Sequence, residues 1–273
     1  MHIIGSAGAT VRRLGGLAVD DYGTTDDRVP LVLLHGMTFD RTIWRPLVDR
    51  LQQTDPGRRV LALDLPGHGD SPEQERYDLA AVPSQLHEVI KEAGLTSPVI
   101  VGHSAGALAA TVYAARFPVS GVLNVDQPLQ LGEFATLIRS LRNQLEGPGF
   151  AATWQVFWDS FHTERLPADA RKLVRETCRP RQQVVTGYWR EVLHGSVQEV
   201  TDRTEQALSA IGETGVPYLH IAGEEPPAGY AEWLTKRIPE ATFAVWGGSG
   251  HFPHLGKPDE FARVLAATAS WPS

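Results

Sequence analysis

The stretch "VIVGHSAGALAA", residues 99–110, decides how this chain is interpreted. The apolar run that opens it meets a turn in which Ser104 stands between Gly102 and Gly106, and a small-residue helical pattern follows. A serine hydroxyl acts as a nucleophile only when it is exposed, held rigidly and placed near a base. A sharp turn from a strand into a helix does this, and the two glycines remove side chains that would clash across it. The segment therefore predicts a nucleophilic serine.

Short apolar runs alternate with helical patterns on both sides of this segment. A starting hairpin is indicated by two apolar runs around Gly15-Gly16. The other runs predict buried strands at 30–36, 58–64, 98–104, 121–126, 216–223 and 241–248. Helices are predicted near 42–53, 79–94, 105–116, 229–238 and 258–270. Near-continuous apolar strands that alternate with helices are typical of a mostly parallel sheet covered on both faces, so we expect an α/β fold.

Residues 127–210 interrupt the alternation, because they contain no convincing strand. Their helical spacing and many aromatic residues predict four or five helices inserted between two strands. We expect this insertion to form a helical lid over the edge of the sheet. Residues 1–126 and 211–273 would then make up the core.

Composition excludes several classes of partner. The chain has 273 residues, 42% of them hydrophobic, and a formal net charge of −7 without a basic block, which argues against nucleic-acid and membrane partners. Cys178 is the only cysteine, so no intrachain disulfide can form. The N-terminus lacks the pattern of a secretion signal, and no apolar stretch approaches the ~20 residues that span a bilayer. These features predict a cytoplasmic protein, and we expect either a monomer or a homodimer.

Four stretches together resemble the α/β-hydrolase superfamily: LLHGMTFDRTIW (33–44), LALDLPGHGDS (61–71), VGHSAG (101–106) and GSGHFPH (248–254). The resemblance runs almost from end to end and is weakest in 127–210. It implies a mostly parallel central sheet, an inserted lid and a serine esterase or lactonase that needs no cofactor. Haloalkane dehalogenases and epoxide hydrolases of the superfamily require aspartate at the position of Ser104, which disfavours those activities.

The general base is expected to be His251. It lies in a Gly-rich loop after the last predicted strand and before the C-terminal helix, where this fold places its base. His254 is the nearest rival, but it lies beyond a proline and closer to the helix. His103 adjoins Ser104, and neighbours on a tight turn point in different directions, so we expect it to pack under the turn. The remaining histidines show no ligand spacing, and no metal site is predicted.

The oxyanion hole should use two backbone N–H groups. One belongs to Ala105, the residue after the nucleophile, at the start of a helix whose free N–H groups and dipole favour negative charge. By resemblance the other is the N–H of Met37, with Gly36 allowing the backbone to come close to the substrate.

Two positions compete for the acid that orients the base. Many members of the superfamily carry it after the penultimate strand, in a pattern like Gly-x-x-Asp, but Pro226 occupies the aspartate position here and leaves Glu224 or Glu225 as candidates. Other branches place the acid after the strand that follows the nucleophile helix. That strand ends at Asp126 in "GVLNVDQP", and we favour Asp126.

The Asp126 arrangement, with the ending "GHFPH…PDEFARVL", is similar to the resorcylic-lactone (zearalenone-type) hydrolases of this superfamily. Those enzymes have glutamate at the corresponding position, so Asp126 departs from their pattern. The similarity favours lactones among the candidate substrates.

The lid supplies candidate walls for a substrate pocket, namely Trp154, Trp158 and Trp189. A pocket under an aromatic lid is largely apolar, which implies a neutral, apolar, medium-sized ester or lactone. Carbon–carbon bond hydrolases and aminopeptidases share the same catalytic frame and remain alternatives. A ligand receptor or a lyase built on this fold is a further alternative, which would show little hydrolytic turnover.

Overall fold

A single eight-stranded sheet forms the centre of the protein, for which a computed structural model describes residues 8–271. The strands are β1 (Thr10–Leu14), β2 (Leu17–Tyr22), β3 (Leu31–Leu34), β4 (Val60–Leu63), β5 (Val99–His103), β6 (Gly121–Val125), β7 (Tyr218–Ala222) and β8 (Ala241–Val245). Their order across the sheet is β1-β2-β4-β3-β5-β6-β7-β8. The β1–β2 and β2–β4 pairs are antiparallel and every other pair is parallel. Each predicted strand is present, and the predicted α/β class is confirmed.

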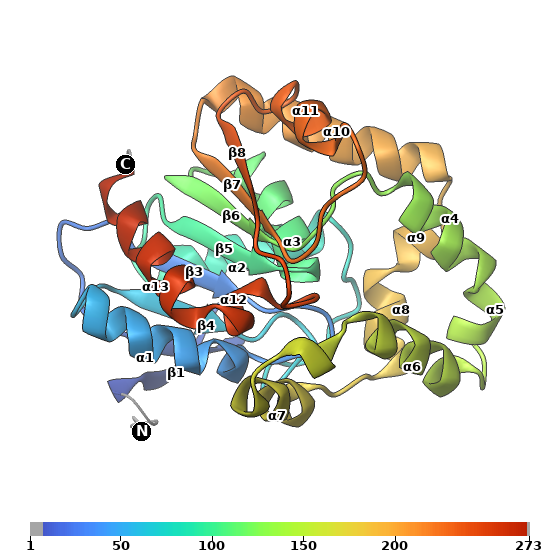
Figure 1. Ribbon diagram of the computed structural model, residues 1–273, viewed down its shortest axis with the longest axis horizontal. Coiled ribbons are helices and arrows are strands. Elements are labelled where there is room, and N and C mark those ends of the chain that lie inside the picture. The colour runs from blue at the N-terminus through green and yellow to red at the C-terminus, as the bar shows by residue number, and fades with distance from the viewer. Residues whose placement is uncertain (1–7, 272–273) are drawn as a thin grey trace.

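Helices cover both faces of the sheet, as Figure 1 shows. Helices α1 (Arg45–Thr54) and α13 (Pro258–Ala267) pack together on one face, preceded by the short helices η2 (Arg41–Trp44) and α12 (Pro253–Gly256). Helices α2 (Ala81–Glu92), α3 (Ala105–Ala114) and α11 (Tyr230–Thr235) lie on the other face, and η4 (Thr268–Ser270) follows α13. Between residues 8 and 271, no helix has both the length and the apolar character needed to cross a membrane.

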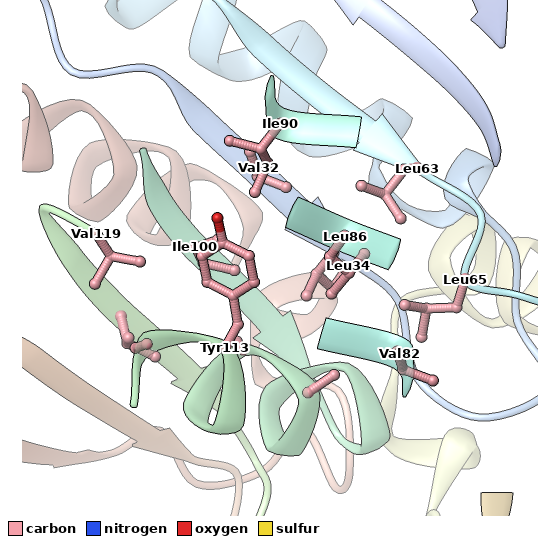
Figure 2. Close-up of a cluster of buried hydrophobic side chains, with 14 of the residues drawn as sticks. Val32, Leu34, Leu63, Leu65, Val82, Leu86, Ile90, Ile100, Tyr113 and Val119 are labelled. Carbon is pink, nitrogen blue, oxygen red and sulfur yellow. The ribbon is translucent and has the colours of Figure 1, made fainter. Parts of the chain in front are cut away.

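The two-sided cover explains why the central strands are continuous apolar runs. All residues of β3 and β4 are buried, because parallel strands contact helices on both faces. Figure 2 shows Leu34 and Ile100 of the sheet in one cluster with Leu86 of α2 and Tyr113 of α3. This packing fixes the carboxyl ends of the parallel strands, where ligands bind in open α/β sheets.

Most of the helices between β6 and β7 lie beside one end of the sheet, on the right in Figure 1, while α10 runs along the top and α7 lies at the bottom. They are α4 (Gly132–Ser140), α5 (Arg142–Leu145), α6 (Phe150–Ser160), η3 (Thr163–Arg165), α7 (Ala168–Thr177), α8 (Gln182–Tyr188), α9 (Arg190–His194) and α10 (Val197–Thr214). The boundary expected at residue 210 falls inside α10. Leu208 and Ile211 of this helix are buried in the same cluster as Tyr113, so its second half packs as part of the core layer.

Candidate active site

The turn between β5 and α3 places Ser104 at the carboxyl end of the sheet. Ser104 has φ 51° and ψ −124°, a conformation that non-glycine residues rarely adopt. A Cβ at Gly102 would lie 2.3 Å from the carbonyl oxygen of Gly106, and a Cβ at Gly106 would lie 2.4 Å from that of His35. A side chain at Gly102 would therefore force β5 and α3 apart, and one at Gly106 would force α3 away from the end of β3. The sharp turn needs Gly102, and the close packing of α3 on β3 needs Gly106.

Asp126 and His251 form a hydrogen-bonded pair beside this turn. Asp126 follows β6 and His251 follows β8, and Asp126 Oδ2 lies 2.7 Å from His251 Nδ1. The other carboxylate oxygen accepts the N–H of Gly223 at 2.6 Å. Burial opposes ionisation of Asp126, but the hydrogen bond and charge of His251, with the Gly223 N–H, outweigh it and lower the pKa of the carboxyl below its usual value. Asp126 is therefore an ionised acceptor that fixes one orientation of the imidazole.

Neither alternative acid approaches the histidine in this way. Glu224 is exposed and forms an ion pair with Arg165 of the lid. Glu225 is also exposed and has no hydrogen bond to His251 among the described residues. The contact that an orienting acid needs is made by Asp126.

The predicted catalytic and oxyanion-hole residues line one cavity of about 870 Å³. Its wall includes Ser104, Asp126, His251, Met37 and Ala105. No hydrogen bond joins Ser104 to His251 in the described structure, and such bonds often tighten only once a substrate is bound. The described residues include no cluster of three or more His, Cys, Asp and Glu side chains that could hold a metal ion.

The loop that carries His251 is held from two sides. The N–H of His251 donates to the carbonyl of Phe161 in the lid at 3.1 Å, and the Phe161 ring stacks on the imidazole at 4.8 Å. The carbonyl oxygen of His251 accepts a hydrogen bond from Nε2 of His103 at 2.8 Å. His103 is fully buried, and burial, with its histidine neighbours, holds its pKa well below the usual value, so the ring is neutral. The packing expected for His103 is present, whereas the contact of Phe161 with His251 has no signature in the sequence.

The loop after β3 is also held from two sides. Thr38 has φ 70°, its N–H donates to Nε2 of His68 at 3.1 Å, and its carbonyl accepts the N–H of Arg179 in the lid at 2.7 Å. The neighbouring N–H of Met37 and the N–H of Ala105 donate to no acceptor in the described residues. Both are free to receive a substrate oxygen.

Gly36 lies behind this loop rather than on the cavity wall. A Cβ at Gly36 would lie 2.9 Å from Nδ1 of His103 and 3.2 Å from Cβ of Ser104. The glycine therefore allows the loop to approach Ser104. Gly36 therefore does not face the substrate cavity, contrary to the expectation from the sequence.

The three tryptophans expected to wall the pocket divide into two groups. Trp154 and Trp189 line the cavity, with ring centroids 6.2 Å apart. Trp158 does not line it, because the end of α6 turns this side chain against Phe161 and the apolar cluster that contains Phe39. The cavity wall instead includes Phe157 of the same helix.

His254, the rival base, is unsuited to proton transfer. It is fully buried among Trp44, Phe252 and Phe261, and no described protein atom hydrogen-bonds either ring nitrogen. Burial, with a smaller effect of His251, lowers its pKa to about 3. The ring stays neutral and acts as a packing residue.

This burial makes the stability of the protein depend on pH. His254 titrates near pH 6.5 in the unfolded chain and only near 3 when folded, so the unfolded state binds the extra proton between those values. The stability that neutral His254 contributes is present above pH 6.5 and is lost as the pH falls, by up to ~1.4 kcal/mol per pH unit. When the pH is lowered from 7.5 to 5.0, the free energy of unfolding of His254→Phe should fall by about 2 kcal/mol less than that of the wild type. Urea unfolding at each pH measures it.

His194→Gln is the matched control, because His194 is exposed. It should show the pH dependence of the wild type. Equal losses in the wild type and His254→Phe would mean that the folded protein protonates His254 readily.

The comparisons with known proteins give the class. A family model described as the alpha/beta hydrolase family matches residues 31–264, which is most of the chain. The protein therefore belongs to the α/β hydrolase family.

The relatives indicate the kind of bond. The chain is 26% identical over 249 residues to the pimeloyl-[acyl-carrier protein] methyl ester esterase of Yersinia enterocolitica, covering 86% of this chain and 91% of that protein. It is 26% identical over 248 residues to the biotin biosynthesis bifunctional protein BioHC of Cellvibrio japonicus, covering 87% of this chain but only 47% of that longer protein. A solved structure described as "Est816 as an N-Acyl homoserine lactone degrading enzyme" shares the fold, with a TM-score of 0.64, 21% identity and coverage of 98% and 99%. Hydrolysis of an ester bond is the activity that the family and the esterase relative support.

Proposed function

We propose that the protein is a serine hydrolase that cleaves a carboxylic ester or lactone bond of an apolar small molecule through an acyl-enzyme. The observation that carries the proposal is the 2.7 Å contact between Asp126 Oδ2 and His251 Nδ1, made on the wall of the cavity that also exposes Ser104. This is the arrangement of nucleophile, base and orienting acid that acyl transfer requires.

In the proposed reaction, Ser104 Oγ attacks the substrate carbonyl while Nε2 of His251 takes the serine proton. His251 then gives that proton to the leaving alcohol oxygen, and the acyl group stays on Ser104. A water molecule, losing its proton to His251, releases the acid and restores the serine. Asp126 remains ionised throughout and stabilises the imidazolium.

The oxygen of the attacked carbonyl gains negative charge in this step. The free N–H groups of Met37 and Ala105 are the proposed donors to it. Both belong to backbone whose position is fixed, one by the Thr38 contacts and the other by the start of α3, so little reorganisation is needed during the reaction.

The cavity supports an apolar, medium-sized substrate. Its volume of about 870 Å³ is within the range of pockets for small organic molecules, and Trp154, Phe157 and Trp189 of the lid contribute to its wall. The ester-cleaving and lactone-degrading relatives are consistent with either bond. Trp154 and Trp189 are proposed to contact the substrate.

The test is the intact mass of the protein after treatment with a short alkyl fluorophosphonate. An activated serine should add one phosphonyl group to the wild type and none to Ser104→Ala. Wild-type protein that is folded but carries no adduct would contradict the proposal and favour a receptor built on this fold.

A further inference from the structure

A histidine in the middle of β7 has no role in the reaction described above. His220 is 2% exposed, and it lines the same cavity as Ser104. The strand around it is otherwise apolar or aromatic. Burying an imidazole at this depth costs more free energy than burying an apolar side chain would.

The hydrogen bonds of Tyr230 fix where the imidazole proton lies. The phenol oxygen accepts the N–H of Leu129 at 3.1 Å and lies 3.2 Å from Nδ1 of His220. The phenol has one proton to donate, and Nδ1 is the only acceptor that it contacts among the described residues. Nδ1 therefore accepts, and the imidazole proton sits on Nε2.

The ring is a neutral and rigid donor. Burial lowers the pKa of His220 to about 4, against the opposing effect of Asp126. Tyr230 packs edge-on against the ring at 5.4 Å, and Phe243 packs against it at 4.8 Å. These contacts and the hydrogen bond to Tyr230 hold the ring in one orientation.

Among the described residues, the only hydrogen bond of the His220 ring is the one at Nδ1, so no protein atom accepts a hydrogen bond from Nε2. Because His220 lines the cavity, this donor is available to a ligand that brings an acceptor oxygen. Ala222 and Tyr230, which line the cavity beside His220, present little that could do so, because the Tyr230 hydroxyl is already engaged.

We propose that His220 Nε2 donates a hydrogen bond to a second oxygen of the substrate, apart from the reacting carbonyl. The inference rests on the proposed function and narrows its substrate class to esters or lactones that carry an additional carbonyl or hydroxyl oxygen.

The sheet register separates this subsite from the oxyanion hole. His220 of β7 pairs across Asn124 of β6 with Gly102 of β5, two residues before Ser104. Neighbouring strands lie ~4.8 Å apart, so β7 is roughly 10 Å from β5. The second oxygen is therefore several bonds away from the carbonyl that Ser104 attacks.

The experiment compares matched esters that differ by one oxygen. An unsubstituted medium-chain ester is paired with analogues in which one methylene becomes a ketone, moved along the acyl part and then along the alcohol part. For at least one position, we expect His220→Leu to lower kcat/KM about 3- to 10-fold, the effect of one neutral hydrogen bond. For the unsubstituted ester, kcat/KM of His220→Leu should differ from that of the wild type by less than twofold.

His220→Gln is the matched variant, because its side-chain amide can place an N–H near the position of Nε2. It should restore most of the preference for the keto ester. Fluorophosphonate labelling and thermal unfolding of each variant check that Ser104 stays reactive and that the fold is intact.

The outcomes separate this proposal from the proposed function. Equal losses for keto and unsubstituted esters in His220→Leu would mean that His220 only supports the nearby Asp126 or the fold, and would overturn the second-oxygen subsite while ester hydrolysis stands. The second-oxygen subsite would also be overturned if the wild type cleaved every keto ester no faster than the unsubstituted ester. A wild type without adduct or turnover would overturn both proposals.

Discussion

Replacing Ser104 by alanine should lower kcat for a chromogenic ester by about 10⁶-fold, the size of effect that follows loss of a nucleophile acting with its base. The hydroxyl is the only group proposed to form the covalent bond to the substrate, so no neighbour can replace it. KM should change little, because the cavity wall is otherwise intact. Initial rates over a range of ester concentrations give both constants.

Ser160→Ala is the matched control for this variant. Ser160 lines the same cavity, but its hydroxyl donates to the carbonyl of Phe157 and lies outside the proposed reaction. It should keep kcat within about threefold of the wild type. A Ser104→Ala protein that retained more than about a hundredth of wild-type kcat would show that another nucleophile or an activated water cleaves the ester.

The features that the sequence predicted are those with local causes. The turn at Ser104 was predictable because a chain that folds so sharply excludes a Cβ at Gly102, and the close contacts there bear this out, whereas Gly106 is needed for the approach of α3 to β3. The alternation of strands and helices was predictable because burial on both faces of a parallel sheet demands continuous apolar runs. Both signals lie within a few residues along the chain.

The features that the sequence did not predict depend on contacts between distant segments. Phe161 and Arg179 of the lid support the loops that carry His251 and Met37 through backbone atoms, and a backbone donor or acceptor has no residue signature. Trp158 illustrates the reverse case: it shares the aromatic pattern of its helix but faces the core cluster. Periodicity identifies an apolar face, and only the tertiary fold determines what that face contacts.

The lid contacts also bear on how the proposed site is assembled. The carbonyl of Phe161 holds the N–H of His251, and the N–H of Arg179 holds the carbonyl of Thr38 beside Met37. The proposed base and one proposed oxyanion donor therefore both depend on backbone of the lid. We infer that the lid in this arrangement supports the catalytic loops as well as covering the cavity.

Replacing Asp126 by asparagine should lower kcat by about 10⁴-fold while leaving the fold intact. The asparagine amide has nearly the same shape, and its oxygen can still accept the N–H of Gly223. Its NH₂ group would then face Nδ1 of His251, which must become an acceptor and move its proton to Nε2. In that tautomer His251 cannot take the proton of Ser104, so the loss should appear in kcat, with KM nearly unchanged.

Glu225→Gln and Glu224→Gln are the controls that decide between the candidate acids. Both side chains line the cavity, and both are exposed, so each substitution removes a charge without disturbing packing. Each should retain kcat within about threefold of the wild type. Near-normal turnover in Asp126→Asn together with a large loss in one glutamine variant would transfer the orienting role to that glutamate. Because the pKa of Asp126 is lowered, its carboxylate is already ionised in the wild type at pH 7 and its ionisation does not limit the rate. Raising the pH from 7 to 8.5 should therefore leave the ratio of wild-type kcat to Asp126→Asn kcat unchanged.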